Sequence, residues 1–219
     1  TRTVVTADKF SAAFDRSGQL TSILGAPNAR VVASRPGQPE MVSTSRQVTA
    51  QFTKAGAIES LVQKGEFHLA EASSPVGRQA WADTARYTPE DQVLLLTGSP
   101  RAVEGGMTIT SDTLRLHRQT NDAVAEGQVK TTYSELQQQP GGAMLATSDP
   151  VHVTARTAVV KGATSLALYS GGARLWQGAN IVQAPTIEFD RNRRTVVAQG
   201  ATGTPRSARP VSTVFVQQD

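Results

Sequence analysis

The 219-residue chain contains no cysteine, and aromatic residues make up only 5% of it. The absence of cysteine excludes a disulfide scaffold and a thiolate metal site, and it is compatible with any redox compartment. No apolar run approaches the length that a membrane-spanning helix needs. Apolar residues at sustained helical spacing are also missing, so long amphipathic helices are not expected.

The common catalytic and nucleotide-binding motifs are absent as well. There is no G-x-S-x-G elbow, Walker loop or G-x-G-x-x-G segment. His68, His117 and His152 have no ligand partner at metal spacing. Glu188 and Asp190 could mimic a carboxylate pair, but acid–base catalysis needs a cleft that shifts one pKa, and a solvated strand end is the simpler interpretation. We therefore predict no enzyme activity, no cofactor and no metal site.

Positive charge is in modest excess, with a formal net charge of +4. This suits solubility, and it also favours an anionic partner such as nucleic acid, phosphate-bearing lipid or acidic glycan. Some of the charge gathers near the C-terminus, at Arg191, Arg193, Arg194, Arg206 and Arg209. No aromatic residues alternate with these arginines, as a platform for single-stranded nucleic acid would require, so nucleic acid is not an expected partner.

Val, Thr, Ser, Gln, Gly and Ala are plentiful, which suits many short strands. The clearest feature of the chain is an internal repeat. With the small residue before the usual Asp taken as the start, the copies begin at Ala7, Ser45, Ala82, Ser111, Ala155 and Ala184. Each copy closes at a glycine, namely Gly25, Gly65, Gly98, Gly127, Gly171 and Gly200. In the last four copies the start and the glycine are the same sixteen residues apart.

Three columns of this repeat are apolar in almost every copy. Three residues after the start stand Phe10, Val48, Ala85, Leu114, Ala158 and Ile187. Five residues after the start stand Ala12, Ala50, Tyr87, Leu116, Val160 and Phe189. Three residues before the glycine stand Val62, Leu95, Val124, Leu168 and Val197, with the polar Ser22 in the first copy. Chance hardly supplies three such columns in register in a chain that is 38% hydrophobic.

The apolar pattern changes phase inside each copy. The position two before the start is mostly apolar, as is the start itself, and the apolar positions then move to odd offsets. Because strand side chains alternate with a period of two, this change requires a bulge or corner near the recurring Asp. Asp8, Asp83 and Asp112 are expected to brace that bend by accepting hydrogen bonds from backbone N–H groups.

Each copy is thus predicted to be a strand with a bend, a polar turn and a return strand. Stacked hairpins that bend at the same place fold over into two facing sheets with an apolar interior. The strand edges at the ends of such a stack must be capped, covered or paired with another chain. We predict one all-β domain over residues 1–219, a folded-over antiparallel β stack of about six strand–turn–strand repeats that begin near residues 4, 42, 79, 108, 152 and 181. The Gln/Gly/Pro-rich segment 134–150 is predicted to be an exposed loop insert.

Two phrases in these columns resemble a known family. ADTARY at 82–87 with LLTG at 95–98, and SDTL at 111–114 with VAEGQV at 124–129, look like the OstA-like domain of lipopolysaccharide transport. VVAQG at 196–200 fits the same closing phrase. That domain occurs in the LptA and LptC proteins and in the N-terminal part of LptD. The chain departs from the family pattern where Arg46, Arg156 and Pro185 stand in place of the Asp.

The resemblance implies a folded-over antiparallel stack, called a β-taco or β-jellyroll, whose apolar groove holds the acyl chains of lipopolysaccharide. It also implies a periplasmic location in the Gram-negative cell envelope, with lipid passed toward the outer membrane. The implied partners are lipopolysaccharide or lipid A, and other Lpt proteins or copies of the same chain joined through edge strands. A signal peptide or membrane anchor outside this segment is compatible with the start at Thr1.

The apolar columns provide twelve candidate residues for a lipid groove. They are Phe10, Val62, Tyr87, Leu95, Leu114, Leu116, Val124, Val160, Leu168, Ile187, Phe189 and Val197. Plain core packing is the alternative interpretation of the same residues. Many column positions hold Ala or Val, so side chains alone are expected to fill the interior incompletely. Each buried acyl methylene would contribute about 0.8 kcal/mol. Trp81 and Trp176 are expected at the mouth of the groove or as caps on the core.

Two other classes of function stay open at this point. A structural or scaffolding β-repeat domain would assemble through its edge strands without lipid, and a dry, fully packed interior would favour it. An enzyme acting on glycans ranks third, because β stacks also host lyases. It would need a surface cleft with paired acid and base residues, which the sequence does not display.

Overall fold

The structure is a computed structural model that describes residues 2–74, 77–134, 149–193, 195–200 and 210–214. Most of the predicted loop insert 134–150 lies outside the described residues, as do Arg194, Arg206 and Arg209. The described residues form strands, turns and bends without any helix, so none of them makes a helix that could cross a membrane. The predicted all-β class is therefore confirmed.

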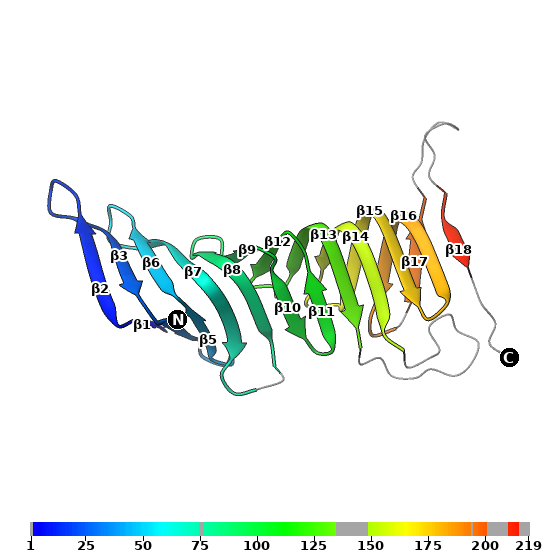
Figure 1. Cartoon of the computed structure of the whole chain (residues 1–219), viewed down its shortest axis with the longest axis horizontal. Helices are drawn as coiled ribbons and strands as arrows, with labels where there is room; N and C mark the ends of the chain where they lie inside the picture. The colour runs from blue at the N-terminus through cyan, green and yellow to red at the C-terminus, as the bar shows by residue number, and fades with distance from the viewer. Residues whose placement is uncertain (1, 75–76, 135–148, 194, 201–209, 215–219) are drawn as a thin grey trace. The chain divides into compact units, whose positions relative to one another are not determined.

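The chain divides into two compact units, coloured along the chain in Figure 1. Unit 1 comprises Thr1–Glu104 and Arg115–Gln119, and unit 2 comprises Gly105–Leu114 and Thr120–Asp219. The expectation of a single domain across residues 1–219 stays a prediction. The strands of unit 1 are β1 (Arg2–Thr6), β2 (Lys9–Phe14), β3 (Leu20–Ala26), β4 (Ala29–Ser34), β5 (Met41–Ser45), β6 (Gln47–Phe52), β7 (Ile58–Glu71), β8 (Gln79–Thr88), β9 (Val93–Thr97) and β10 (Arg101–Glu104). Those of unit 2 are β11 (Met107–Thr110), β13 (Ala123–Tyr133), β14 (Val151–Val160), β15 (Leu166–Gln177), β16 (Asn180–Asp190), β17 (Thr195–Gln199) and β18 (Ser212–Val214), while β12 (Thr113–His117) contributes residues to both.

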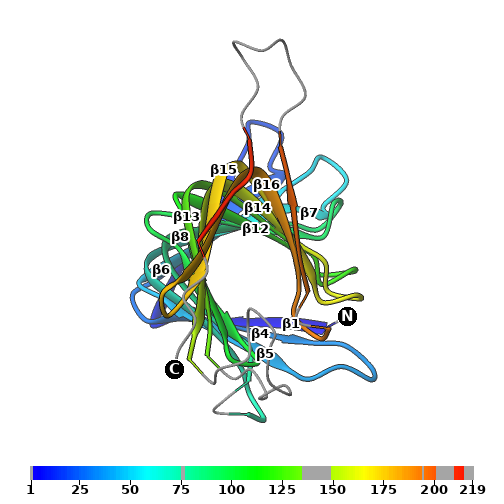
Figure 2. The ribbon, with the colours of Figure 1, turned by 90° about the vertical axis from the view of Figure 1, so that its right-hand side faces the viewer.

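Unit 1 contains two antiparallel layers, which we call its first and second leaf. The first leaf has the strand order β2–β3–β6–β7–β8–β9. The second leaf has the order β1–β4–β5–β7–β8–β10. β7 and β8 belong to both leaves because each crosses the bend. Figure 2 shows β1, β4 and β5 as a layer apart from β6.

Unit 2 repeats this arrangement with long strands that run through the bend. Its first leaf combines one half each of β13, β14, β15 and β16 with β17. Its second leaf combines β11, the other halves of the same four strands, and β18. The folded-over antiparallel stack that the repeat predicted is thus present in each unit.

The bend lies where the sequence changes phase. The strand register shifts between Lys64 and Phe67 in β7, Glu126 and Val129 in β13, Thr154 and Thr157 in β14, and Ser170 and Ala173 in β15. At each closing glycine from Gly65 to Gly171, the glycine and the residue after it both adopt positive φ, between 44° and 87°. Two successive left-handed residues turn the strand sharply, as β-bulges do, and direct its two halves into different leaves.

In the second to fifth copies, the residue after the start packs across the bend onto the closing glycine. Asp83 donates its backbone N–H to the Gly98 carbonyl oxygen at 3.3 Å, and Asp112 donates to the Gly127 carbonyl oxygen at 2.9 Å. A methyl group added to Gly98 would lie 2.5 Å from the Asp83 Cβ, closer than real carbon atoms approach. Glycine is therefore required here both for its positive φ and for the absence of a side chain.

The side chains at these positions also form pairs across the bend. The pairs are Asp8 with Asn28 at 2.7 Å, Arg46 with Glu66 at 2.5 Å, and Asp112 with Gln128 at 3.3 Å. The observed donors to the Asp8 and Asp112 carboxylates are thus side-chain amides, not the backbone N–H groups that were predicted. Because Arg46 covers Gly65 in its copy as Asp83 covers Gly98, the departure from Asp leaves the bend intact.

Replacing the closing glycine should therefore lower the free energy of unfolding more than replacing a glycine that has the same φ in a turn with no atom near it. Gly98→Ala adds a clash with Asp83 to the strain of φ +79°, so we expect the free energy of unfolding to fall by about 3 kcal/mol. Gly56→Ala is the matched control, because Gly56 has φ +78° and no atom near its missing Cβ, and it should cost about 1 kcal/mol. Urea unfolding measures both, and equal losses would show that the contact with Asp83 is unimportant.

Candidate functional site

The inner face of unit 2 consists of residues that stand opposite one another on neighbouring strands, on the side of the sheet that faces the other leaf. Ala125, Ala158, Tyr169 and Ile187 stand opposite one another across β13 to β16, and all four are fully buried. A second row on the same face runs through Ala123, Val160, Ala167, Phe189 and Val196. These two rows form the floor of the interior in the first leaf of unit 2.

The two leaves of unit 2 pack directly against each other. Tyr133 of the second leaf lies with its ring 4.8 Å from the Phe189 ring of the first leaf. Its hydroxyl also shares a hydrogen bond of 2.7 Å with the Tyr169 hydroxyl. Val153 and Leu175 also belong to the second leaf and are fully buried. The interior of unit 2 is therefore closed at these residues.

Unit 1 has a small closed region and an open one. Ala29 and Val31 of the second leaf pack on Val48 and Leu61 of the first leaf to form a buried cluster. Val5, Ala50 and Tyr87 pack against this cluster and are only partly buried. The leaves of unit 1 thus meet at this cluster, and Phe67 and Leu96 are buried elsewhere in the unit.

The inner face of unit 1 opens at β2. Phe10 stands opposite Gly25, which stands opposite the buried Val48, so Phe10 belongs to the inner face. Phe10 is 48% exposed, and Phe14, four residues later on the same side of β2, is 62% exposed. Among the described residues, β2 pairs with β3 alone and β1 with β4 alone, so both are edge strands. Unit 1 therefore presents an uncovered aromatic surface between two free strand edges.

A buried polar network also bridges the leaves of unit 1. The Ser43 hydroxyl of β5 donates to the Gln63 Oε1 of β7 at 2.7 Å, and the Gln63 Nε2 donates to the Ser45 hydroxyl at 3.1 Å. The Ser45 hydroxyl in turn donates to the Gln47 carbonyl oxygen at 3.0 Å. Because each of these side chains is buried and bonded, the network holds the leaves together without leaving a polar group unsatisfied.

Seven of the twelve candidate residues lie on the inner side or are fully buried. Phe10, Tyr87, Val160, Ile187 and Phe189 belong to the inner rows described above. Leu114 and Leu116 share one side of β12, and Leu114 is fully buried. These seven come from the two columns that follow the start of each copy. Whether lipid contacts them stays a prediction.

The other five candidates, Val62, Leu95, Val124, Leu168 and Val197, lie on the outer face. Val197 stands opposite Glu188, and Glu188 stands opposite Leu168. Leu168 is 41% exposed and Val197 is 48% exposed. Placing this column in the groove was wrong because the hairpin pairs Ile187 with Ala198 rather than with Val197. A difference of one residue in register moves a side chain to the opposite face of the sheet.

The inner residues of the return strands are the neighbours of those five. They are Leu94, Leu96, Ala123, Ala125, Ala167, Tyr169, Val196 and Ala198, with Leu61 and Gln63 in the second copy. The sequence pattern does not single them out, because apolar residues occur on both sides of these strands. The length of each hairpin turn would have distinguished the two sides, since it fixes which residues stand opposite each other.

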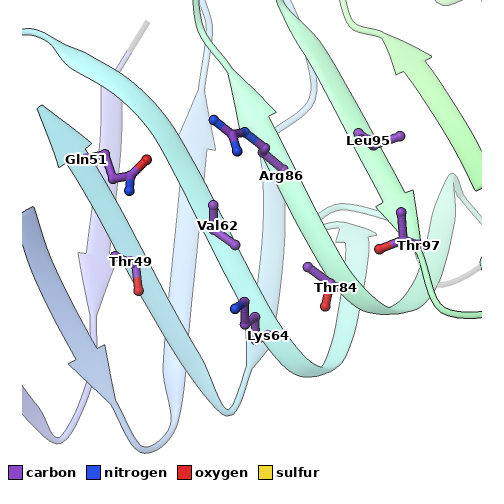
Figure 3. A pocket seen from close by; sticks show the side chains of 8 residues that line it. All are labelled: Thr49, Gln51, Val62, Lys64, Thr84, Arg86, Leu95 and Thr97. Carbon is purple, nitrogen blue, oxygen red and sulfur yellow. The ribbon is translucent and has the colours of Figure 1, made fainter. Parts of the chain in front are cut away.

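The outward-facing Val62 and Leu95 line a shallow depression of about 410 Å³. Figure 3 shows its eight side chains on one face of β6 to β9, two from each strand. The other six are Thr49, Gln51, Lys64, Thr84, Arg86 and Thr97. The depression is thus mainly polar and lies on the outside of the first leaf, away from the space between the leaves.

Trp81 and Trp176 also face outward. Trp81 stacks on His68 with ring centroids 5.1 Å apart, and Trp176 stacks on His152 at 5.2 Å. The two residues of each pair stand opposite each other on neighbouring strands. The residues before and after each tryptophan in the chain are buried on the other side of the sheet. Neither expected position, groove mouth or core cap, was correct. Among the residues that the structure covers, no group of three or more His, Asp and Glu could hold a metal ion.

The described arginines of the C-terminal group are already engaged. The Arg191 Nη1 donates to the Gly105 carbonyl oxygen at 3.3 Å. The Arg193 Nε lies 3.8 Å from the Asp190 carboxylate. These contacts tie both side chains to turns of unit 2.

The fold and the inner faces define a class of folded-over antiparallel β proteins with an apolar interior. Residues 82–195, just over half of the chain, match the family described as LptA/(LptD N-terminal domain) LPS transport protein. The chain therefore belongs to this family, and the resemblance to the OstA-like domain is confirmed. A comparison with curated proteins gave no significant match.

One solved structure with a similar fold is that of LptH from Pseudomonas aeruginosa. LptH is described as the LptA homologous periplasmic component of the conserved lipopolysaccharide transport device. The TM-score is 0.54 at 20% sequence identity, and the alignment covers 64% of this chain and 95% of LptH. At this identity the likeness shows the fold.

The buried tyrosine pair of unit 2 should make stability depend on pH above about 10, the ordinary tyrosine pKa. Burial raises the pKa of Tyr169 to about 12, and burial raises the pKa of Tyr133 well above its usual value. The folded state therefore favours the neutral hydroxyls, and this contribution is complete below the unfolded pKa and lost as the pH rises toward the folded one.

We expect the free energy of unfolding to fall by roughly 3 kcal/mol through Tyr169 alone between pH 10 and 12. Tyr169→Phe should remove this part of the pH dependence, because phenylalanine has no proton to lose. Chemical unfolding of both proteins at pH 9 and above 11 measures the difference. Parallel pH profiles for the two proteins would contradict the prediction.

Proposed function

We propose that the chain is a periplasmic, non-catalytic module that binds lipopolysaccharide on the inner faces of its leaves and passes it toward the outer membrane. The observation that carries the proposal is the uncovered inner face at β2, where Phe10 and Phe14 expose aromatic side chains. Membership of a family of LPS transport proteins supports it. The expectation that the protein is not an enzyme belongs to the same proposal.

The open inner face suits acyl chains for a simple physical reason. Covering Phe10, Phe14 and the partly buried Ala50 with methylene groups removes apolar surface from water on both partners. Each buried methylene contributes about 0.8 kcal/mol, so part of one acyl chain is enough for useful affinity. The surface is also a continuation of the buried cluster around Val48, so a ligand chain would extend a core that already exists.

The edge strands provide the second part of the proposed role. β1 and β2 in unit 1, and β17 and β18 in unit 2, each have one ladder partner among the described strands. Unpaired strand edges bind further strands through backbone hydrogen bonds. We infer that other Lpt proteins, or copies of the same chain, add strands at these edges, so that one inner face leads into the next.

A structural role without lipid is the second candidate, and the interior of unit 2 favours it. Tyr133, Tyr169 and Phe189 fill that interior with their own side chains. Lipid would enter unit 2 only if the leaves separated and the hydrogen bond between the two tyrosine hydroxyls broke. The two candidates therefore differ most clearly at the open face of unit 1.

Site-specific photo-crosslinking distinguishes the two candidates. A benzoylphenylalanine at Phe10 or Phe14 should crosslink to lipid A in micelles of mild detergent, because both side chains lie on the open inner face. The matched control is Leu168, which has a similar exposure but lies on the outer face. We expect crosslinks from Phe10 and Phe14 at least about five times as frequent as from Leu168, since the surface around Phe10 continues into the cluster around Val48, whereas Leu168 stands opposite Glu188.

Equal crosslinking from the inner and outer positions would indicate non-specific contact with detergent. An absence of crosslinks at all three positions would favour the structural role. A probe at Phe189 adds a further arm, because lipid reaches it only if the leaves of unit 2 separate.

A further inference from the structure

Two arginines of unit 1, Arg35 and Arg118, lie together at the rim of its inner face. Arg35 begins the loop between β4 and β5, and Arg118 directly follows β12. The Arg35 Nη2 donates to the Gln92 Oε1 at 3.1 Å, and the Arg118 backbone N–H donates to the Gln92 carbonyl oxygen at 3.0 Å. Gln92, in the turn between β8 and β9, thus holds both arginine segments in place.

Neither guanidinium has a carboxylate partner among the residues described. The ion pairs observed there join other cations to acids, and none includes Arg35 or Arg118. The Arg35 Nε–H is buried and has no hydrogen-bond acceptor. An unpaired buried donor is unfavourable, and a positively charged one especially so. The site therefore has an unfilled requirement for an acceptor.

The two charges also act on each other. Burial, and next the positive charge of Arg35, lower the pKa of the Arg118 guanidinium from its ordinary value. Like charges held close together in a partly buried place repel each other unless an anion lies between them. Guanidinium groups present forked N–H donors that match the oxygens of a phosphate group. The missing acceptor is thus best supplied by an anion with several oxygens.

The position of the pair relates it to the apolar interior. The Arg118 guanidinium lies over the Tyr87 ring, 5.3 Å from its centroid. Tyr87 stands opposite Leu61 and Leu94 on the inner face, and it packs against the buried cluster. One aromatic side chain therefore contacts the apolar interior and supports a cation at its rim. A ligand with acyl chains on the inner face would carry its polar group to this place.

We propose that Arg35 and Arg118 form a binding site for a phosphate group carried by a ligand whose acyl chains lie on the inner face of unit 1. This rests on the proposed function, since it assigns the polar end of the same ligand to two residues. The outer depression also contains two cations, Lys64 and Arg86. Both are exposed, and neither presents a buried donor without an acceptor, so the same argument does not apply there.

The test compares two lipids and three proteins. The lipids are diphosphoryl lipid A and the same lipid A with both phosphates removed. The proteins are the wild type, the double variant Arg35→Gln with Arg118→Gln, and the control Arg30→Gln, whose exposed side chain lies on the outer side of β4. We expect the double variant to bind diphosphoryl lipid A about tenfold more weakly than the wild type. Its affinity for the dephosphorylated lipid should be unchanged, and Arg30→Gln should resemble the wild type with both lipids.

Further arms separate the failure of this site from the failure of the proposed function. Equal affinity of the wild type for both lipids, or an equal loss in Arg30→Gln, would overturn the phosphate site while lipid binding stands. If the wild type binds neither lipid, the proposed function fails, and with it the ligand assigned here. Titration with inorganic phosphate then shows whether the arginines bind free phosphate. If they do, free phosphate is the ligand in place of a lipid headgroup. If the double variant does not fold, Arg35→Gln in the loop replaces it, with an expected loss of about threefold for the phosphorylated lipid alone.

Discussion

The contact on which both units depend is that between the closing glycine and the side chain that covers it in the second to fifth copies. Gly98 and Asp83 show it most clearly, because no Cβ would fit between them and the glycine φ is +79°. Two successive left-handed residues bend the strand, and the covering side chain fixes the bend from the other side. Arg46 covers Gly65 in the same way, so the contact depends on shape more than on charge. The repeat therefore specifies the shape of the bend, and Asp is one of several residues whose side chain fits it.

The bend also determines which residues line the interior. Along β16 the inner side chains have even offsets before the bend and odd offsets after it, and the change occurs at Pro185, which stands against the two-residue bulge of Gly171 and Gly172 in β15. Ala184 and Ile187 of β16 are both buried for this reason, although they are three residues apart. A flat strand would have placed one of them in solvent. The bulge thus allows one sequence to contribute a face to each leaf.

Much of this was predictable from the sequence, and the part that was not has a specific cause. The change of phase near Asp83 and Asp112 was enough to predict the bend, and the columns with Ile187 and Phe189 were correctly placed inside. The column with Leu168 and Val197 was misplaced because its face depends on how many residues each hairpin turn contains. The composition of a turn does not determine its length. A turn that is one residue longer can contain the same polar residues and glycine, yet it places the following side chains on the opposite face of the sheet. The Arg35–Arg118 pair was missed because its members are 83 positions apart and share no motif.

The same repeat produces a closed interior in unit 2 and an interior that is open at β2 in unit 1, and side-chain size explains the difference. The inner rows of unit 2 contain Tyr169 and Phe189, and Tyr133 reaches them from the opposite leaf. The corresponding rows at β2 and β3 place Phe10 beside Gly25 and Ala12 beside Ile23, so small residues leave the aromatic surface uncovered. Protein interiors are normally densely packed. An inner row whose side chains are too small to reach this density leaves apolar surface that another molecule can cover. The bend therefore decides where the interior lies, and the size of the inner side chains decides where a ligand can complete it.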